Sequence, residues 1–310
     1  MIKPGFKVEY LVPQSFAPST YGRSGVTYRV FNLHNPPYKM VYSMDGVGFS
    51  GKELSTVRIP YQHGNSIIGM KLSPRVIKLG FKQVFRCKKD YDEARNFLFD
   101  TFRENRWETD FPYLNTLRFK WLEDGVYITR NIDVYFSGGL DLDRPRKNEW
   151  NEFSFDETIE FTAPYPLFYD PEEITTASLT WGTSTLPLYE PFVFGAKESS
   201  TTIVYSGTWE SFPKILLTGP VSNISLIHET SGARIDFEGT VFTGDKVLLE
   251  TGYNAKATGY YGEDFISYVS GDLSSFSLLP SPQTNVIRVY VDGVCSGLIN
   301  LIYKTWYRGI

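Results

Sequence analysis

The chain has 310 residues, of which 42% are hydrophobic and 21% are charged, and its formal net charge is −4. This is the composition of an ordinary globular protein, and the length exceeds what one hydrophobic core usually serves, so we expect two domains. No apolar run is long enough to predict a transmembrane helix, and the N-terminus lacks the apolar core of a signal peptide, so we expect folding in a cytoplasm. The two cysteines, Cys87 and Cys295, exclude a disulfide framework and cannot complete a zinc site alone.

Aromatic residues make up 16% of the chain, which favours β-structure because Tyr and Phe suit pleated, half-buried surfaces. The charge is unevenly distributed. Residues 1–163 hold 23 Lys and Arg against 20 Asp and Glu, whereas residues 164–310 hold 8 against 15. The change falls where a strand pattern runs into Pro164, Pro166 and Pro171, so we expect the two domains to be joined there.

The first half predicts strands and one helix. Residues 90–105 carry an apolar stripe at three- and four-residue steps, with Asp90 as the expected N-cap. The Asp124-Gly125 pair predicts a tight hairpin turn. The strands are expected from apolar runs or from alternation of apolar and polar side chains, at residues 26–36, 75–85, 117–123, 126–136 and 153–163.

The second half predicts a linker followed by a sandwich of strands. Residues 164–201 are rich in Pro, Ser, Thr and Gly and poor in charge, which is typical of a linker or arm. From residue 202 onward, short apolar runs alternate with turn residues, as in a β-sandwich. These runs are Ile203–Tyr205, Ile215–Leu217, Ile224–Ile227, Ile235–Phe237, Val247–Leu249, Phe265–Val269, Val286–Val291 and Leu298–Tyr303.

The expected fold is therefore mainly β in two domains. Residues 1–163 form an N-terminal β-barrel or sandwich-like domain with one helix. Residues 164–201 form the linker, and residues 202–310 form an antiparallel β-sandwich.

No residue is predicted to be catalytic, to bind a cofactor or to ligate a metal. Gly46–Gly51 has the spacing of a dinucleotide-binding loop, but the residues that follow carry no helical stripe, so a glycine-rich loop is favoured. The three histidines, His34, His63 and His228, lie far apart and belong to no recognisable motif.

An acidic pair and a basic stretch leave alternatives open. Asp141 and Asp143 could suggest a calcium or glycosidase site, but a solvated loop is favoured because no further ligands accompany them. Residues 71–89 form either a phosphate-binding face or a solvated or subunit-facing surface, and the acidic balance of the chain favours the second. The basic residues are Lys71, Arg75, Lys78, Lys82, Arg86, Lys88 and Lys89.

A cluster of tyrosines suggests a second kind of function. Tyr253, Tyr260, Tyr261 and Tyr268 lie in or near a glycine-rich stretch, and sugars can lie against exposed aromatic rings. Packing in the core or against loops is the favoured interpretation, because Tyr serves equally well in half-buried positions.

The order of several motifs resembles the distal tail protein family of siphophages. RVIKLGF at residues 75–81 precedes the helix, and WNEFSFDETIEFTAPYPLFYD at residues 150–170 is similar to the family's strand that ends in an aromatic- and proline-rich stretch. Phe212-Pro213-Lys214-Ile215, NISLIHETSGARIDF, TGDKVLLET and FSLLPSPQTNVIRVY then follow the family's order. Pro282 stands near a position where the family often has glycine.

The resemblance implies a structural protein of the phage tail tip, without catalytic residues or cofactors. It implies a homohexameric ring made by the N-terminal domain and a galectin-like C-terminal sandwich. The implied partners are the tail tube protein, a tail-associated hub protein, and receptor-binding or side-fibre proteins. DNA would pass through the ring without specific binding, and no membrane is contacted. The implied location is the virion tail tip, after assembly in the host cytoplasm. The alternative is a carbohydrate- or receptor-binding adhesion module of the tail.

Overall fold

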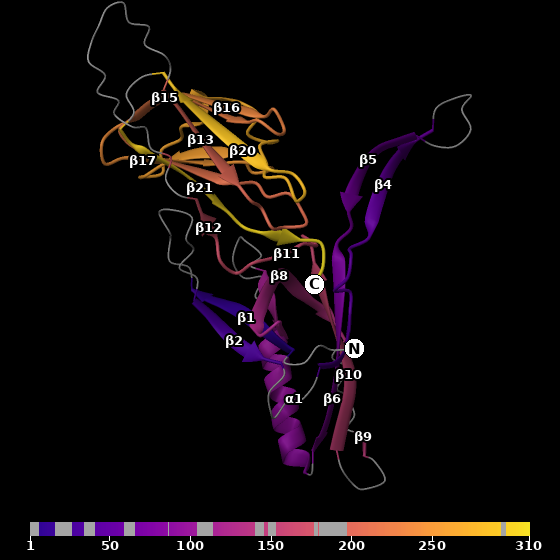
Figure 1. Ribbon diagram of the computed structural model, residues 1–310. Helices are drawn as coiled ribbons and strands as arrows, with labels where there is room; N and C mark the ends of the chain where they lie inside the picture. Colours follow the sequence, from indigo (N-terminus) through magenta and orange to yellow (C-terminus); the bar gives the residue numbers. More distant parts are fainter. Residues whose placement is uncertain are drawn as a thin grey trace, which may run out of the picture. The chain divides into compact units, whose positions relative to one another are not determined.

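The computed structural model describes residues 6–15, 27–33, 41–58, 66–85, 87–103, 114–139, 146–147, 153–176, 179, 197–292 and 296–310. These residues form two compact units, each visible in Figure 1. The first unit holds the described residues up to Pro171 and also Tyr307–Ile310. The second holds the described residues from Glu172 to Trp306. The chain therefore leaves the first unit, builds the second and returns.

The expected linker is divided between the two units. Pro164–Pro171 belong to the first unit, where Leu167 and Phe168 are buried. Ile174–Thr175 (β12) and Lys197–Ile203 (β13) pair with strands of the second unit. The prolines end a strand, but the apolar side chains between them pack into the core, so the structural boundary follows Pro171.

The first unit is built around one sheet with the strand order β2-β1-β7-β8-β10-β6-β3. Two short strands, β11 and β22, pair with each other, and β11 also pairs with β8; β9 pairs with β10. The strands are β1 (Lys7–Ser15), β2 (Thr27–Asn32), β3 (Val41–Asp45), β6 (Arg75–Phe85), β7 (Asn115–Glu123), β8 (Val126–Gly138), β9 (Arg146–Lys147), β10 (Phe153–Ala163), β11 (Phe168–Tyr169) and β22 (Trp306–Tyr307).

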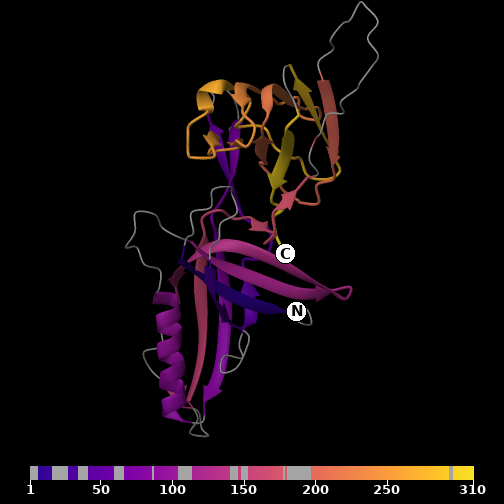
Figure 2. The ribbon, with the colours of Figure 1, turned by 90° about the vertical axis from the view of Figure 1, so that its left-hand side faces the viewer.

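This sheet folds over its own core. Tyr10 on β1 and Phe161 on β10 belong to strands that are not neighbours, yet their ring centroids are 5.6 Å apart. Phe102 of the helix contacts both rings, at 5.2 Å and 5.6 Å. The helix α1 (Lys88–Arg103) runs alongside long strands of this sheet (Figure 2). The four residues of its apolar stripe, Tyr91, Ala94, Leu98 and Phe102, are buried in the same core.

The helix begins earlier than its sequence predicts. Asp90 was expected to be the N-cap, but the helix starts at Lys88 and Asp90 lies in its first turn. Cys87 takes the capping place, because its Sγ accepts a hydrogen bond from the Asp90 N–H at 3.4 Å. The carboxylate of Asp90 still lies near the positive end of the helix dipole, which is favourable.

The hairpin and the strands predicted at 75–85, 117–123, 126–136 and 153–163 are confirmed, whereas the strand predicted at 26–36 is observed as Thr27–Asn32, with residues 26 and 34–36 outside the described part of the chain. The β7–β8 hairpin turns at Asp124 and Gly125, whose φ angles are 50° and 81°. Two successive positive φ values identify the tight primed turn that Asp-Gly favours. A further hairpin was not predicted: β4 (Lys52–Val57) and β5 (Ser66–Leu72) form a separate two-stranded sheet.

The second unit is a sandwich of two antiparallel five-stranded sheets. One sheet has the order β12-β21-β14-β17-β18, and the other has the order β13-β20-β15-β16-β19. Their remaining strands are β14 (Lys214–Thr218), β15 (Val221–His228), β16 (Arg234–Val241), β17 (Lys246–Glu250), β18 (Lys256–Gly259), β19 (Val269–Gly271), β20 (Asn285–Val291) and β21 (Leu298–Tyr303).

Alternation of buried and partly exposed residues along these strands places one continuous core between the sheets. Ile215 and Leu301 from one sheet are fully buried together with Phe237 and Val289 from the other. The run Phe265–Val269 was expected to be a strand, but Ile266–Tyr268 form a 3-10 turn (η1). The expected mainly β fold, with a helix in the N-terminal unit and a C-terminal sandwich, is confirmed.

Candidate functional site

The β4–β5 hairpin carries several exposed apolar residues of the first unit. It stands away from the strands of the main sheet (Figure 1), and none of its residues is buried. Leu54 and Met70 are cross-strand partners and therefore share one face of the hairpin. The exposed fractions are 52% for Leu54, 53% for Met70, 63% for Ile67 and 70% for Ile68.

Such a hairpin is poorly stabilised by itself. A two-stranded sheet without a core behind it is marginal in water, and exposed apolar clusters usually mark interaction surfaces. Phe49, in the segment that leads into β4, is 85% exposed and extends the apolar character toward the sheet. The hairpin and Phe49 together, residues 49–72 as far as they are described, are called the hairpin surface below.

A buried arginine fixes the base of this surface. Arg75 opens β6 directly after the hairpin, and its Nη1 donates hydrogen bonds to the carbonyls of Gly46, at 2.8 Å, and Gly48. Its Nε and Nη2 donate to the carbonyl of Pro166, at 3.1 Å and 2.9 Å, and Nη2 also donates to the carbonyl of Arg308 at 2.6 Å. Four carbonyls from three segments that are distant in sequence thus accept hydrogen bonds from one guanidinium.

The surroundings of Arg75 keep it charged but desolvated. Burial lowers its pKa to about 10, so the group remains protonated at neutral pH. Its guanidinium also lies over the ring of Phe168, 4.8 Å from the centroid. Arg75 therefore acts as a structural clamp rather than as part of a phosphate-binding face.

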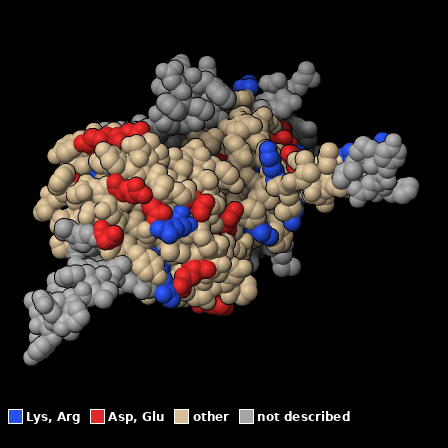
Figure 3. Space-filling view, turned by 90° about the horizontal axis from the view of Figure 1, so that it is seen from above, with Lys and Arg blue, Asp and Glu red and all other residues tan. Residues whose placement is uncertain are grey.

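The other basic residues of the stretch 71–89 do not combine into one free basic surface in the described part of the chain. Lys78 forms an ion pair with Glu160 at 2.5 Å, which raises the pKa of Lys78. Lys89 lies 3.8 Å from Glu93 on the helix. The side chains of Lys82 and Arg86 lie outside the described residues. Figure 3 shows one face of the molecule, on which Lys and Arg are interspersed with Asp and Glu.

The remaining sequence candidates fall in separate places. Gly46–Gly51 lead into strand β4, so the segment lacks the helix that a dinucleotide-binding loop requires. His228 is fully buried, and its Nδ1 lies 2.7 Å from the Ser231 hydroxyl. Cys87 is exposed. The residues outside the described part of the chain are His34, His63, Asp141, Asp143 and Cys295.

No three His, Cys, Asp or Glu side chains among the described residues are grouped to hold a metal ion. In the same residues, no helix has the length and hydrophobicity needed to cross a membrane.

The structure places Tyr253 apart from the other three tyrosines of the cluster. Tyr253 is 81% exposed and rests against Phe212, with 5.5 Å between the ring centroids. Tyr260, Tyr261 and Tyr268 line a pocket of the second unit. None of the four is a core residue, so the core part of the favoured interpretation is wrong; the contact of Tyr253 with Phe212 fits its other part, packing against loops.

Comparisons with known proteins give a fold but no sequence relative. No family model matches the sequence, and no curated protein is significantly similar to it. The crystal structure of SPP1 Dit (gp 19.1), a paradigm of the hub adsorption apparatus in phages that infect Gram-positive bacteria, matches with a TM-score of 0.61 and 14% identity. The match covers 89% of this chain and 96% of that one.

The structure of the phage P2 baseplate in its activated conformation with Ca has a TM-score of 0.45 at 10% identity, over 96% of this chain and 97% of that one. The SPP1 match confirms at the level of the fold the resemblance to distal tail proteins that the sequence motifs indicate.

Proposed function

We propose that the protein is a structural hub of a phage tail tip, where six copies form a ring. The hairpin surface of the first unit carries this proposal, because it is an apolar, unsupported element that needs a partner. The fold shared with SPP1 Dit supports it, since that protein belongs to a hub adsorption apparatus.

The proposed partner of the hairpin surface is a second copy of the chain. In a cyclic assembly each subunit offers one surface and receives a different one from its neighbour. The hairpin surface is the offered element, and residues 1–163 supply the ring contacts. The clamp around Arg75 holds the base of the hairpin on the main sheet, so the element is presented in a fixed direction.

The proposed partners follow from the position of such a ring at the tail tip. The ring joins the tail tube protein to a tail-associated hub protein and lets DNA pass without specific binding. The second unit holds receptor-binding or side-fibre proteins. The ring acts by assembly and not by catalysis. It resides at the virion tail tip after assembly in the host cytoplasm.

Electron cryomicroscopy of tail tips tests the proposal. The expected result is an axial ring of six copies in which the hairpin surface of each subunit packs on its neighbour. A location outside the axial ring, or a copy number other than six, contradicts it. The alternative of an adhesion module rests on a different observation, the pocket of the second unit.

A further inference from the structure

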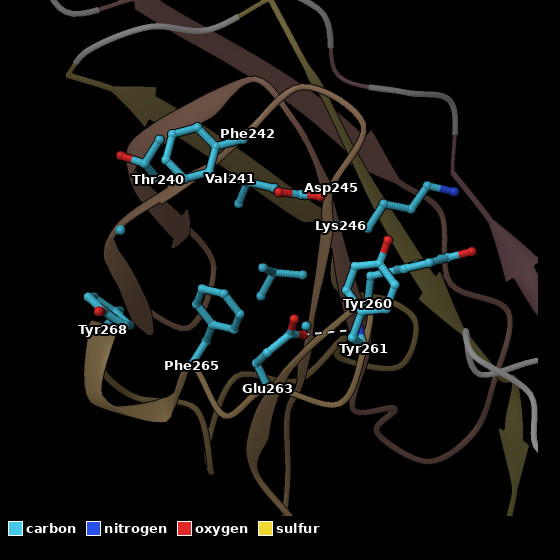
Figure 4. Close-up of a pocket in the computed structure, with 13 residues that line it drawn as sticks. Thr240, Val241, Phe242, Asp245, Lys246, Tyr260, Tyr261, Glu263, Phe265 and Tyr268 are labelled. Atoms are coloured by element: carbon cyan, nitrogen blue, oxygen red, sulfur yellow. Dashed lines mark hydrogen bonds between the residues drawn. The ribbon is translucent and has the colours of Figure 1, made fainter.

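A pocket of about 370 Å³ opens in the second unit, where the ends of several strands meet. One wall comes from the end of β16 and its turn to β17, and the other comes from the loop between Gly259 and Tyr268 (Figure 4). This size lies within the range of pockets that bind small molecules. The floor includes Val241 and Val247, which belong to the sandwich core and give the pocket a rigid base.

Aromatic rings surround the opening. Phe242 is 69% exposed, Tyr261 79% and Tyr268 49%. The rings of Tyr260 and Tyr261 meet edge to face with their centroids 4.8 Å apart, and Phe265 lies 5.8 Å from Tyr268. Because the rings support one another in pairs, they form preorganised apolar surfaces on both sides of the pocket.

A carboxylate points into the space between these rings. Glu263 is directed toward the pocket interior in Figure 4, and its Oε2 accepts a hydrogen bond from the backbone N–H of Tyr261 at 3.0 Å. A Cβ atom at residue 259 would lie 2.4 Å from that oxygen, so Gly259 leaves the room that the carboxylate occupies. A carboxylate has about four acceptor positions, and one N–H leaves the others for a ligand.

The charges of the lining select against an anionic ligand. Asp245 and Glu263 outnumber the single basic residue, Lys246. The hydroxyls of Tyr260, Tyr261 and Tyr268 add groups that both donate and accept hydrogen bonds. Apolar rings beside hydroxyls and a carboxylate match a ligand with one C–H-rich face and many hydroxyl groups.

We propose that this pocket is a binding site for a neutral saccharide. A sugar ring stacks on the aromatic surfaces of Tyr260 and Phe265, and its hydroxyls donate hydrogen bonds to Glu263. Saccharide binding by this pocket does not require the hexameric ring, so its test is independent of the proposed hub function.

The test is an array of immobilised saccharides probed with the full-length chain. The array carries neutral hexoses, N-acetylhexosamines and 6-deoxyhexoses as mono- and disaccharides, together with uronic acids and phosphorylated sugars. We expect binding to at least one neutral saccharide and none to the charged ones. Binding affinity for the best neutral saccharide is then measured by titration calorimetry.

Three variants locate the binding. Tyr260→Ala removes a ring of the pocket, and Glu263→Gln removes the charge while its amide oxygen can still accept the Tyr261 N–H. Each is expected to weaken binding at least tenfold, because Tyr260→Ala removes a stacking surface and Glu263→Gln removes the charge from a hydrogen-bond acceptor. Tyr253→Ala is the control, because Tyr253 is another exposed tyrosine of the second unit, 81% exposed against 39% for Tyr260, and it does not line the pocket.

The outcomes divide cleanly. Loss of binding in the two pocket variants but not in the control, with unchanged melting temperatures, supports the proposal. Absence of binding to every neutral saccharide overturns it, as does binding that survives both pocket variants. Titration with tetramethylammonium and a lysine-rich peptide is the competing arm: binding of these probes in place of saccharides would show that the aromatic rings hold a cation.

Discussion

The Nη2 of Arg75 donates a 2.6 Å hydrogen bond to the carbonyl oxygen of Arg308 and thereby ties the start of β6 to the last residues of the chain. The two residues are 233 positions apart, and every described residue of the second unit lies between them in sequence. Tyr307 strengthens the attachment, since its hydroxyl donates to Asp170 at 3.1 Å and its ring lies 3.7 Å from the guanidinium carbon of Arg130. The C-terminal residues are therefore part of the first unit.

Replacing Arg75 is expected to destabilise the first unit strongly. Arg75→Met leaves four carbonyls without their donor in a site where Arg75 is only 3% exposed. We expect a loss of about 3–5 kcal/mol in the free energy of unfolding, measured by urea denaturation. Lys71→Met is the control, because Lys71 is exposed four residues earlier, and it is expected to change little. Equal stabilities of the two variants would contradict the clamp.

A methyl group at residue 46 is expected to disturb the base of the hairpin. Gly46 has φ +81°, and a Cβ there would lie 1.9 Å from the Val76 carbonyl oxygen. Gly46→Ala should therefore cost about 2–4 kcal/mol. Gly48→Ala is the matched control, since nothing lies within 4 Å of a Cβ at that position. Thermal unfolding of both variants checks this, and similar melting temperatures would exclude the expected strain.

Charges on the hairpin surface are expected to prevent assembly without destabilising the chain. Leu54 and Met70 are exposed in the free protein, and the double change Leu54→Asp, Met70→Lys places opposite charges on these cross-strand partners, so we expect the melting temperature to stay nearly unchanged. Burying an aliphatic side chain contributes about 1.5–3 kcal/mol, so we expect at least a ~100-fold weaker ring contact. The measurement is the amount of variant chain in purified particles.

Val204→Asp is the control for this change. Val204 is an 87% exposed apolar residue of the second unit, and introducing a charge there should leave incorporation intact. Normal incorporation of the hairpin variant would show that the ring contact lies elsewhere.

Acid is expected to weaken the second unit through His228. Burial lowers the pKa of His228 below its usual 6.5, and the neighbouring Asn285 side chain opposes this shift only in part. The unfolded chain therefore binds a proton near pH 6.5 while the folded unit does not, so stability falls as the pH drops below 6.5. Urea denaturation at pH 7.5, 6.0 and 5.0 should show a smaller fall for His228→Gln than for the wild type. An identical fall would assign the effect to other groups.

Sequence patterns predicted the parts of the fold where one face of a strand is buried. Alternation revealed β6, β10 and the strands of the sandwich, and Asp124-Gly125 revealed a turn. The β4–β5 hairpin gave no such signal, because it has no buried face and therefore no alternation that burial would impose. The structural role of Arg75 could not be predicted from the basic stretch 71–89, because the carbonyls to which it donates hydrogen bonds come from residues distant in sequence.

The candidate sites, too, were predicted only in part from the sequence. The sequence groups Tyr260, Tyr261 and Tyr268 with Tyr253, but only the loop geometry separates them from Tyr253 and brings Glu263 between the rings. The return of Tyr307 to the first unit depends on a pairing of two-residue strands, which is too short to leave a periodic pattern.

The chain leaves the first unit after β11 and re-enters it through β22, and these two short strands pair with each other. The second unit is thus an insertion whose entry and exit lie side by side. A domain with adjacent termini is replaceable at such a junction without interrupting the core that receives it. Recombination at this junction therefore replaces the second unit with another domain while the core of the first unit stays unchanged.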